Sequence, residues 1–278
     1  MTVLELHNRE FERVLPLYRE ADKSFPLISA VIQGKQRGQI FADERERPCS
    51  ALIVTNFGFM FYAGAYNQRF DASLLQLLAV GRPIRPNYLL WYSPPHEWQR
   101  RLDTQPHLSR RRERMRFHFD IDEVGWLKEP VQIRSGYEVT VLSAALIPKA
   151  QRLGLQLESR FWSSDEDLLR NGVGACVVKD NVVISLCYTA AVADGLGEID
   201  VVTDPEFRSS GLGYCAAQEL IRECLRRQII PSWDCFVDNL SSMKLAAKLG
   251  FTPLTSYPFY SFNKPITLGE GSTNIPLT

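Results

Sequence analysis

The chain has 278 residues, of which 45% are hydrophobic and 23% charged, which is ordinary for a globular protein with a substantial core. Its length suits two domains better than one. The formal net charge is zero, so no overall field draws the protein toward nucleic acid or membrane. No apolar run approaches the roughly 18–20 residues that span a bilayer. Because the first ten residues also lack a signal-peptide pattern, we expect a cytoplasmic protein.

The six cysteines are scattered, without a C-x-x-C pair or a His/Cys cluster at zinc spacing. Most of them lie within or beside apolar runs, where a reduced cysteine behaves as a small hydrophobic residue. We therefore expect neither a metal site nor a disulfide framework. The cysteines in apolar runs are Cys176, Cys187, Cys215, Cys224 and Cys235.

The first part of the chain alternates predicted helices and strands, and it contains no nucleotide-binding loop and no nucleophile elbow. Capping residues, glycines and prolines set the predicted ends of these elements. The expected elements are a helix at 4–18, a hairpin of strands 52–54 and 57–62, a helix capped by 71–73 that runs through 78, a strand at 87–92, and a turn at 94–98 into a short helix ending near 102.

An arginine-rich run, Arg110 to Arg116, leads into Phe117-His-Phe119. Clustered arginines beside aromatic residues suit phosphate contact and base stacking. Acidic residues dilute this charge, however, and the alternation of Met115, Phe117 and Phe119 predicts a strand with one face in the core. We therefore do not expect nucleic-acid binding, although the arginines would also suit a groove for an anionic substrate.

A loop-rich stretch at 122–136 is the predicted joint between domains. This divides the chain into an N-terminal α/β domain at 1–130, a second domain at 131–265 and a flexible tail at 266–278. The second domain is predicted to contain a strand at 137–142, helices at 143–153 and from 163–166 to before 172, a hairpin of strands 173–178 and 182–189, a strand at 198–203, a helix to about 228, a strand at 233–237, a helix from 239 and a closing strand at 255–262.

The most informative stretch runs from Gly197 to Gly213. A mostly buried strand ends at Asp204-Pro205, because proline cannot donate to the sheet. Arg208-Ser-Ser-Gly-Leu-Gly213 then opens an amphipathic helix. A helix N-terminus presents unpaired N–H groups and a positive dipole end, which bind a phosphate or pyrophosphate. Glycines allow close approach to the backbone, and Arg208 adds a cation.

This loop, placed after a strand that carries a glutamate, resembles the acetyl-CoA pyrophosphate loop of the GNAT N-acetyltransferase superfamily. The downstream stretch from Asn239 to Phe251, which contains Lys-Leu-Gly-Phe, is similar to the superfamily's usual next element. The resemblance covers roughly the second half of the chain. It implies an α/β (α+β) fold whose mixed, mostly antiparallel sheet is flanked by helices, preceded by a smaller α/β domain that would shape an acceptor pocket.

The resemblance also implies a function and a set of site residues. Acetyl-CoA would be the co-substrate, without a metal, and a primary amine would attack its thioester directly. Glu198 would be the general base, and Asp200, two residues on, would pair with it and raise one of the two pKa values. The cofactor-binding groups would be the backbones of Val201, Val202 and Thr203 for the pantetheine arm, the loop Arg208, Ser209, Ser210, Gly211, Leu212, Gly213 and Tyr214 for the pyrophosphate, and Asn239 and Ser242 for the far wall.

One position departs from the family pattern. Many members carry a tyrosine in the helix before Lys-Leu-Gly-Phe as the acid for the departing thiolate, and here that position is Ala246. Tyr257, Tyr260 or water would then supply the proton. A non-catalytic acyl-CoA sensor is the alternative function, and an acetyltransferase that modifies nucleic acid is a third. The sequence specifies neither an oligomeric state nor the amine, which can be a polyamine, an aminoglycoside, an amino acid or a protein lysine.

Overall fold

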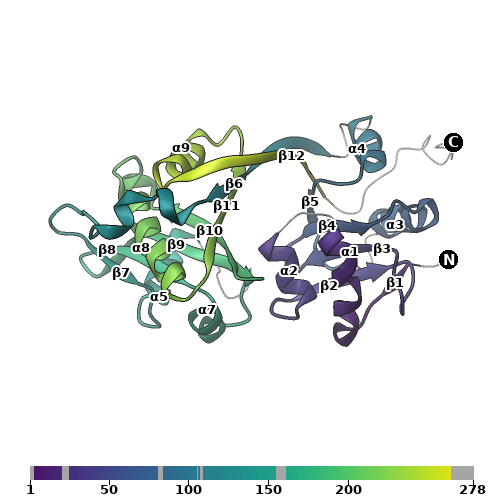
Figure 1. Cartoon of the computed structure of the whole chain (residues 1–278), viewed down its shortest axis with the longest axis horizontal. Helices are drawn as coiled ribbons and strands as arrows, with labels where there is room; N and C mark the ends of the chain where they lie inside the picture. Colours follow the sequence, from purple (N-terminus) through teal and green to yellow (C-terminus); the bar gives the residue numbers. More distant parts are fainter. Residues whose placement is uncertain are drawn as a thin grey trace. The chain divides into compact units, whose positions relative to one another are not determined.

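The computed structural model of the chain describes residues 3–20, 25–80, 84–104, 106, 109–154 and 161–263. It contains two compact units (Figure 1). The first comprises Met1–Ser24, Val31–Arg112 and Tyr257–Thr278, and the second comprises Phe25–Ala30 and Glu113–Ser256. The predicted division at residue 130 stays a prediction, and the predicted tail at 266–278 lies outside the described residues.

The second unit contains most of the elements predicted for the second domain. The hairpin, the helices that follow Ser164 and Gly211, and the central strands lie where they were predicted. Its elements are η2 (Ile121–Glu123), η3 (Gly125–Lys128), β7 (Glu138–Val141), α5 (Ile147–Ala150), η4 (Gln151–Leu153), α7 (Asp165–Asn171), β8 (Gly174–Lys179), β9 (Val182–Ala193), β10 (Leu196–Thr203), η5 (Pro205–Phe207), α8 (Leu212–Arg226), β11 (Ile230–Phe236), α9 (Leu240–Lys248) and the first part of β12 (Phe251–Asn263).

The sheet of the second unit is mixed and mostly antiparallel, as predicted. Strands β7, β8, β9 and β10 pair in antiparallel order, whereas β10 and β11 run parallel. The β8–β9 turn uses Asp180 and Asn181 in left-handed conformation, with φ of 48° and 63°, which suits a tight hairpin. On the other side, β11 pairs antiparallel with β6 (Arg110–Phe119).

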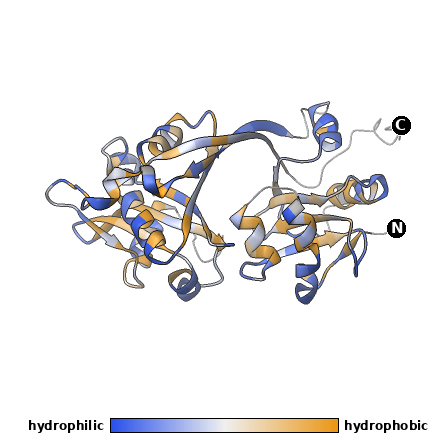
Figure 2. Ribbon diagram, in the orientation of Figure 1, coloured by the Kyte–Doolittle hydropathy of each residue, from blue (hydrophilic) through white to orange (hydrophobic). Residues whose placement is uncertain are grey.

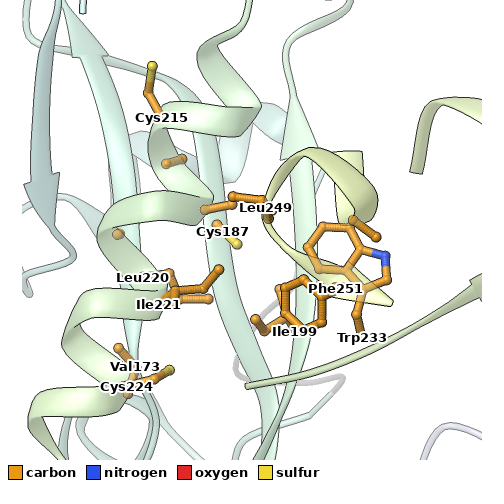
Figure 3. Packing of buried hydrophobic residues seen from close by; sticks show 14 of the residues in the cluster. Val173, Cys187, Ile199, Cys215, Leu220, Ile221, Cys224, Trp233, Leu249 and Phe251 are labelled. Atoms are coloured by element: carbon orange, nitrogen blue, oxygen red, sulfur yellow. The ribbon is translucent and has the colours of Figure 1, made fainter. Parts of the chain in front are cut away.

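Helices α8 and α9 share one hydrophobic core with the sheet (Figure 3). Leu220 and Ile221 of α8 pack with Cys187 of β9 and Leu249 beyond α9 in this core. The neighbours of Cys187 on β9, which point to the opposite face, are buried as well. The sheet is therefore covered on both faces, and Figure 2 shows α8 with both polar and apolar residues, as an amphipathic helix requires. The cysteines predicted to lie in apolar runs are all buried and free.

The first unit is also an α/β unit, but two of its predicted helix starts were wrong. Leu4–Glu5 is a strand that pairs with β2, and the helix begins only at Asn8, where the Glu10 carboxylate accepts the N–H of His7 (2.9 Å). Asp71 is no helix cap, because its helix already begins at Gln68 and the Asn67 side chain accepts the first free N–H groups. The elements are β1 (Leu4–Glu5), η1 (Asn8–Val14), α1 (Leu15–Glu20), β2 (Gly38–Ala42), β3 (Ser50–Thr55), β4 (Phe59–Gly64), α3 (Gln68–Val80), β5 (Tyr88–Tyr92), α4 (His96–Asp103) and the first part of β6; helix α2 (Pro26–Ile32) is divided, with its residues up to Ala30 in the second unit.

The predicted helix at 143–153 also starts later than expected. Its α-helical part, α5, begins at Ile147 with Pro148 in the first turn, where the missing N–H costs nothing, and it continues as a 3-10 turn to Leu153. None of the helices in the described residues is long and apolar enough to cross a bilayer.

The two units repeat one order of elements. In each, a strand is followed by helical segments, three strands, a helix, a strand, a helix and a last strand. In each, the pair formed across the central helix is parallel, β4 with β5 and β10 with β11, and the neighbouring ladders are antiparallel. The last strands are exchanged, because β12 pairs with β5 in the first unit and β6 pairs with β11 in the second. The chain therefore contains two copies of one topology.

A buried carboxylate lies in the first unit at the start of α3. Asp71 is fully buried beside Tyr62 of β4 and Trp98 of α4. Burial raises its pKa to about 6, although Tyr62 and the nearby Arg101 oppose this shift. A folded-state pKa above the unfolded value means that the folded protein binds the proton more tightly. The contribution of Asp71 to stability is therefore most favourable at low pH and is lost as the pH rises toward 6.

Asp71→Asn should remove this pH dependence, because the amide does not ionise. The variant should gain stability relative to the unaltered protein between about pH 4 and pH 6, by up to about 3 kcal/mol, and the difference should stay constant above pH 7. Urea unfolding across pH 4–8 measures it, with the exposed Glu12→Gln of the same unit as control. A pH-independent difference between the two proteins would contradict the assignment.

Candidate functional site

Strands β10 and β11 separate in the middle of the second unit's sheet. Their parallel register runs from Leu196↔Ile230 to Glu198↔Ser232 and ends there. Beyond Glu198, β10 pairs with β9 only, after a bulge between Glu198 and Ile199, while Trp233 pairs with Phe117 of β6. Within the described residues, the rest of β10 therefore has one unpaired backbone edge on its β11 side.

The backbone N–H and C=O groups of β10 point alternately toward β9 and toward the unpaired edge. The N–H of Asp204 donates to the carbonyl of Ile184 on β9 (2.9 Å). In an antiparallel ladder every second residue points its backbone groups to the same neighbouring strand, so Val202 also points to β9. The hydroxyl of Ser185 on β9 accordingly donates to the Val202 carbonyl (3.1 Å). Val201 and Thr203 thus present their N–H and C=O groups on the open edge, whereas Val202 does not.

The loop after β10 leads into α8, whose first turn has no side-chain cap. Asp204 is buried and ion-paired to Arg152 (2.5 Å), which anchors the start of the loop. Ser209 and Gly211 adopt left-handed conformations, with φ of 59° and 84°. Gly211 is the N-cap of the fifteen-residue helix α8, and since it has no side chain, no cap accepts the first N–H groups. The amides that lack an intrahelical acceptor are those of Leu212, Gly213 and Tyr214.

The two glycines of the loop have different roles. A Cβ on Gly211 would meet nothing within 4 Å, so its requirement is the left-handed backbone. A Cβ on Gly213 would lie 3.1 Å from the Thr203 hydroxyl, so this glycine lets α8 pack closely on β10. Gly211 is thus set by its backbone conformation, and Gly213 by the close approach of α8 to β10.

The side chains around the loop are mostly polar and exposed. Arg208 is exposed, and its Nε donates to the Thr203 carbonyl (3.3 Å). The Ser210 hydroxyl donates to the carbonyl of Phe207. Leu212, by contrast, is buried in the core, so only its amide is available to a ligand. Lys248 of α9 lies with its Nζ 4.0 Å from the centre of the Tyr214 ring, which places a second cation beside the start of α8.

The start of α9 lies against β11. The Asn239 side chain accepts the N–H of Ser242 (3.2 Å), so Asn239 is the N-cap of α9. The Ser242 hydroxyl accepts a hydrogen bond from the indole of Trp233 (3.2 Å). Ala246 is fully buried in the core.

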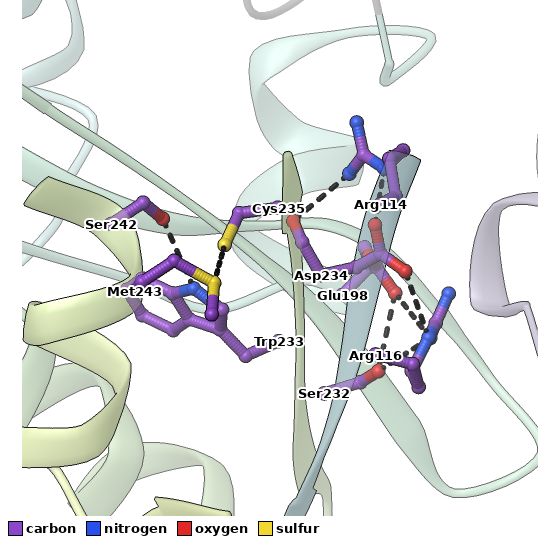
Figure 4. A network of polar contacts seen from close by, with 9 residues as sticks. All are labelled: Arg114, Arg116, Glu198, Ser232, Trp233, Asp234, Cys235, Ser242 and Met243. Atoms are coloured by element: carbon purple, nitrogen blue, oxygen red, sulfur yellow. Dashed lines mark hydrogen bonds and ion pairs between the residues drawn. The ribbon is translucent and has the colours of Figure 1, made fainter. Parts of the chain in front are cut away.

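Glu198 is buried in a network of charges from three strands (Figure 4). Arg116 of β6 donates to its Oε2 (3.2 Å), and so does the Ser232 hydroxyl of β11 (3.2 Å). The same guanidinium lies 3.0 Å from Asp234, which also pairs with Arg114. Burial raises the pKa of Glu198, Arg116 opposes this rise, and Asp234 adds to it.

Asp200 has a different partner from Glu198. Its carboxylate accepts a hydrogen bond from the Tyr188 hydroxyl of β9 (2.8 Å) and from the N–H of Val201 (2.9 Å). The carboxylate that acts on Glu198 electrostatically is that of Asp234. The expected pairing of Asp200 with Glu198 is thus replaced by a bond between Asp200 and the open edge of β10.

The tyrosines considered as acids for the thiolate both belong to the first unit. The Tyr260 hydroxyl donates to Asp103 (2.7 Å) there, and the ring of Tyr257 lies 5.9 Å from that of Tyr92. Neither tyrosine is part of the second unit, which contains Glu198 and α8.

The arginine-rich run is part of strand β6 from its first residue. Arg111 pairs with Asp103 (2.8 Å), whereas Arg114 and Arg116 turn to the carboxylates of the second unit. Met115, Phe117 and Phe119 pack in the core, as the alternation predicted. The sequence does not reveal Arg116, Ser232 and Asp234 as neighbours of Glu198, because β6 and β10 are far apart in the chain. The one signal of a buried polar site was the lone aspartate in the apolar strand Trp233-Asp-Cys-Phe.

The first unit has a corresponding strand, loop and helix, but its loop is shorter and its helix is capped. Only residues 65–67 separate β4 from α3, whereas residues 204–211 separate β10 from α8. The Asn67 side chain accepts the N–H groups of Arg69 and Phe70 (3.1 and 3.2 Å), and buried Asp71 places a carboxylate in the first turn. At the third position of α4, where α9 has Ser242, stands the buried indole of Trp98.

Comparison with known proteins agrees with this topology. A family model described as GNAT acetyltransferase matches residues 16–260. YdfB of Bacillus subtilis (strain 168), described as an uncharacterized N-acetyltransferase, is 27% identical over 262 residues, which cover 94% of this chain and 99% of that protein. A GCN5-related N-acetyltransferase-like protein from Streptococcus suis 89/1591 has a similar fold, with a TM-score of 0.71, 23% identity, and coverage of 92% of this chain and 99% of that one.

A repeated architecture also has a solved counterpart. A tandem GNAT protein from the clavulanic acid biosynthesis pathway superposes with a TM-score of 0.64 at 12% identity, covering 94% of this chain and 98% of that one. Its likeness concerns the fold alone, and it agrees with the two copies of one topology found here. Because the family model spans most of the chain, this protein belongs to the GNAT acetyltransferase family.

Proposed function

We propose that the protein is an N-acetyltransferase that binds acetyl-CoA along the open edge of β10 and at the start of α8. The observation that carries the proposal is the separation of β10 from β11 after Glu198, together with the uncapped N-terminus of α8, which follows β10 after residues 204–211. The pantetheine amides would bond to Val201 and Thr203. The pyrophosphate would bind the amides of Leu212–Tyr214, with Arg208 and Lys248 as nearby cations.

The pantetheine amides would have to replace a bond that already exists. Asp200 accepts the N–H of Val201 in this structure (2.9 Å), so the arm would displace its carboxylate from the edge. The Tyr188 hydroxyl, which donates to the other oxygen of Asp200 (2.8 Å), can hold the displaced carboxylate on β9. Asp200 is therefore proposed as a group at the binding edge, and the catalytic role falls to Glu198.

Glu198 lies where β10 leaves β11, at the end of the edge that the thioester would reach. An amine acceptor arrives as an ammonium ion, and Glu198 would take one of its protons so that the nitrogen lone pair can attack the thioester carbonyl. The C–N bond forms and the C–S bond breaks, and the nitrogen gives its second proton to solvent to become the amide. The CoA thiolate leaves and takes a proton from solvent, because position 246 is a buried alanine. The raised pKa of the buried carboxylate suits a base that works near neutral pH.

Arg208→Ala should weaken acetyl-CoA binding roughly 10- to 100-fold, because a charge-assisted contact to phosphate is lost. Gly211→Asp should weaken it at least as much, since it strains the left-handed turn and adds a negative charge. Calorimetry measures both. The controls are Arg170→Ala, an exposed arginine on α7, and Gly154→Asp, at a left-handed glycine with φ of 75° and open space around it. Unchanged affinity in both loop variants would contradict the assignment.

Glu198→Gln should lower turnover roughly 10²- to 10⁴-fold at neutral pH while leaving acetyl-CoA affinity within a few-fold. Thiol release from acetyl-CoA over a library of primary amines measures turnover and identifies the acceptor class. A protein that binds acetyl-CoA but shows no turnover with any amine would instead be the acyl-CoA sensor.

The chain should bind one acetyl-CoA, because the corresponding loop of the first unit is short, Asn67 caps the helix, and Asp71 places a carboxylate in its first turn. Calorimetric titration should give a stoichiometry of one per chain. Two equivalents, or a full equivalent that persists in Gly211→Asp, would show that the first unit also holds a nucleotide.

A further inference from the structure

The charges around Glu198 are arranged asymmetrically. Oε2 accepts both the Arg116 guanidinium and the Ser232 hydroxyl, at 3.2 Å each. Oε1 accepts no hydrogen bond from the part of the chain that the structure describes. The two carboxylate oxygens are thus in different environments, one fixed by protein donors and the other available to a ligand.

The strand register explains why these residues meet. Arg116 lies directly opposite Asp234 in the antiparallel β6–β11 pair, and Ser232 lies opposite Glu198 in the parallel β11–β10 pair. Ser232 and Asp234 are two residues apart on β11, so their side chains share one face. The Phe25 ring lies 4.6 Å from the Arg116 guanidinium and adds a cation–π contact. Arg116 is therefore fixed from several sides.

The charge balance of the network is neutral. Arg114 and Arg116 of β6 face Glu198 and Asp234, and the β9 partner of Glu198 is the uncharged Ala191. Arg116 alone would hold Glu198 as a strongly ion-paired carboxylate and make it a poor base. Asp234 lies 3.0 Å from the same guanidinium and satisfies much of its charge. Asp234 thus limits how strongly Arg116 binds Glu198.

We propose that Arg116 and Asp234 are positioning residues for Glu198: Arg116 fixes Oε2, Asp234 restrains Arg116, and Oε1 is left to take the acceptor's proton. This rests on the proposed acetyl transfer from acetyl-CoA to an amine. In that step the ammonium nitrogen gives a proton to Oε1, and no other bond changes at Glu198. Arg116 and Asp234 touch neither substrate, and they act only through the carboxylate.

The two substitutions should move the acid limb of the kcat–pH profile in opposite directions. Asp234→Asn leaves Arg116 to bind Glu198 more strongly, so the limb should shift to lower pH by about one unit or more, and kcat at the plateau should fall. Arg116→Gln removes the cation, so the limb should shift to higher pH by a similar amount. Arg116→Lys keeps the charge and should lie closer to the unaltered protein.

The same shifts can be measured without turnover. The free energy of unfolding of each protein is compared, across pH 4–9, with that of the same protein carrying Glu198→Gln in addition. The midpoint of that difference reports the ionisation of Glu198 and should move down in Asp234→Asn and up in Arg116→Gln. Where one buried variant fails to fold, the other and Arg116→Lys still test the direction. Asp122→Asn, an exposed carboxylate after β6, is the matched control.

Equal losses of kcat in both variants with the limb and the midpoint unmoved would overturn the proposal and leave the network a purely structural one. If no amine supports turnover in the unaltered protein, the proposed function fails, whereas opposite shifts of the stability midpoint would still support the effect of Arg116 and Asp234 on Glu198. The two failures are therefore distinguishable.

Discussion

The proposed acetyl-CoA site depends on the point where the parallel pairing of β10 with β11 stops, at Glu198↔Ser232. A closed sheet would use the backbone groups of Val201 and Thr203 within the protein. The separation leaves them on an open edge, directly before the loop that starts α8, and it sets Glu198 at the point of divergence. The proposed base, binding edge and phosphate site thus follow one another along the chain from this one irregularity in the sheet.

Buried charges join the strands at this irregularity. Strands β6, β11 and β10 are joined at the divergence by Arg116, Ser232 and Glu198 as well as by backbone bonds. Unpaired charges in such a place would be costly, whereas two arginines with two carboxylates are balanced. Since β6 also begins in the first unit and β12 ends there, each copy of the topology depends on a strand from the other half of the chain.

Local patterns predicted the second unit well. The hairpin around Asp180-Asn181, the strand with Glu198 and the helix after Gly211 depend on turn chemistry and periodicity within a few residues. The sequence does not predict the repeat in the first unit, because its loop is short, Asn67 rather than a glycine caps the helix, and Trp98 stands where α9 has Ser242. The neighbours of Glu198 could not be predicted either, since the pairing of Arg116 with Asp234 is a matter of register between distant strands.

Amide hydrogen exchange with and without CoA tests the central claim most directly. The amides of Val201 and Thr203 and of Leu212–Tyr214 should gain protection when CoA is added, while that of Val202, already turned to β9, and those at the start of α3 should not change. Protection that appears at α3 instead, or no change along β10 and the start of α8, would contradict the account.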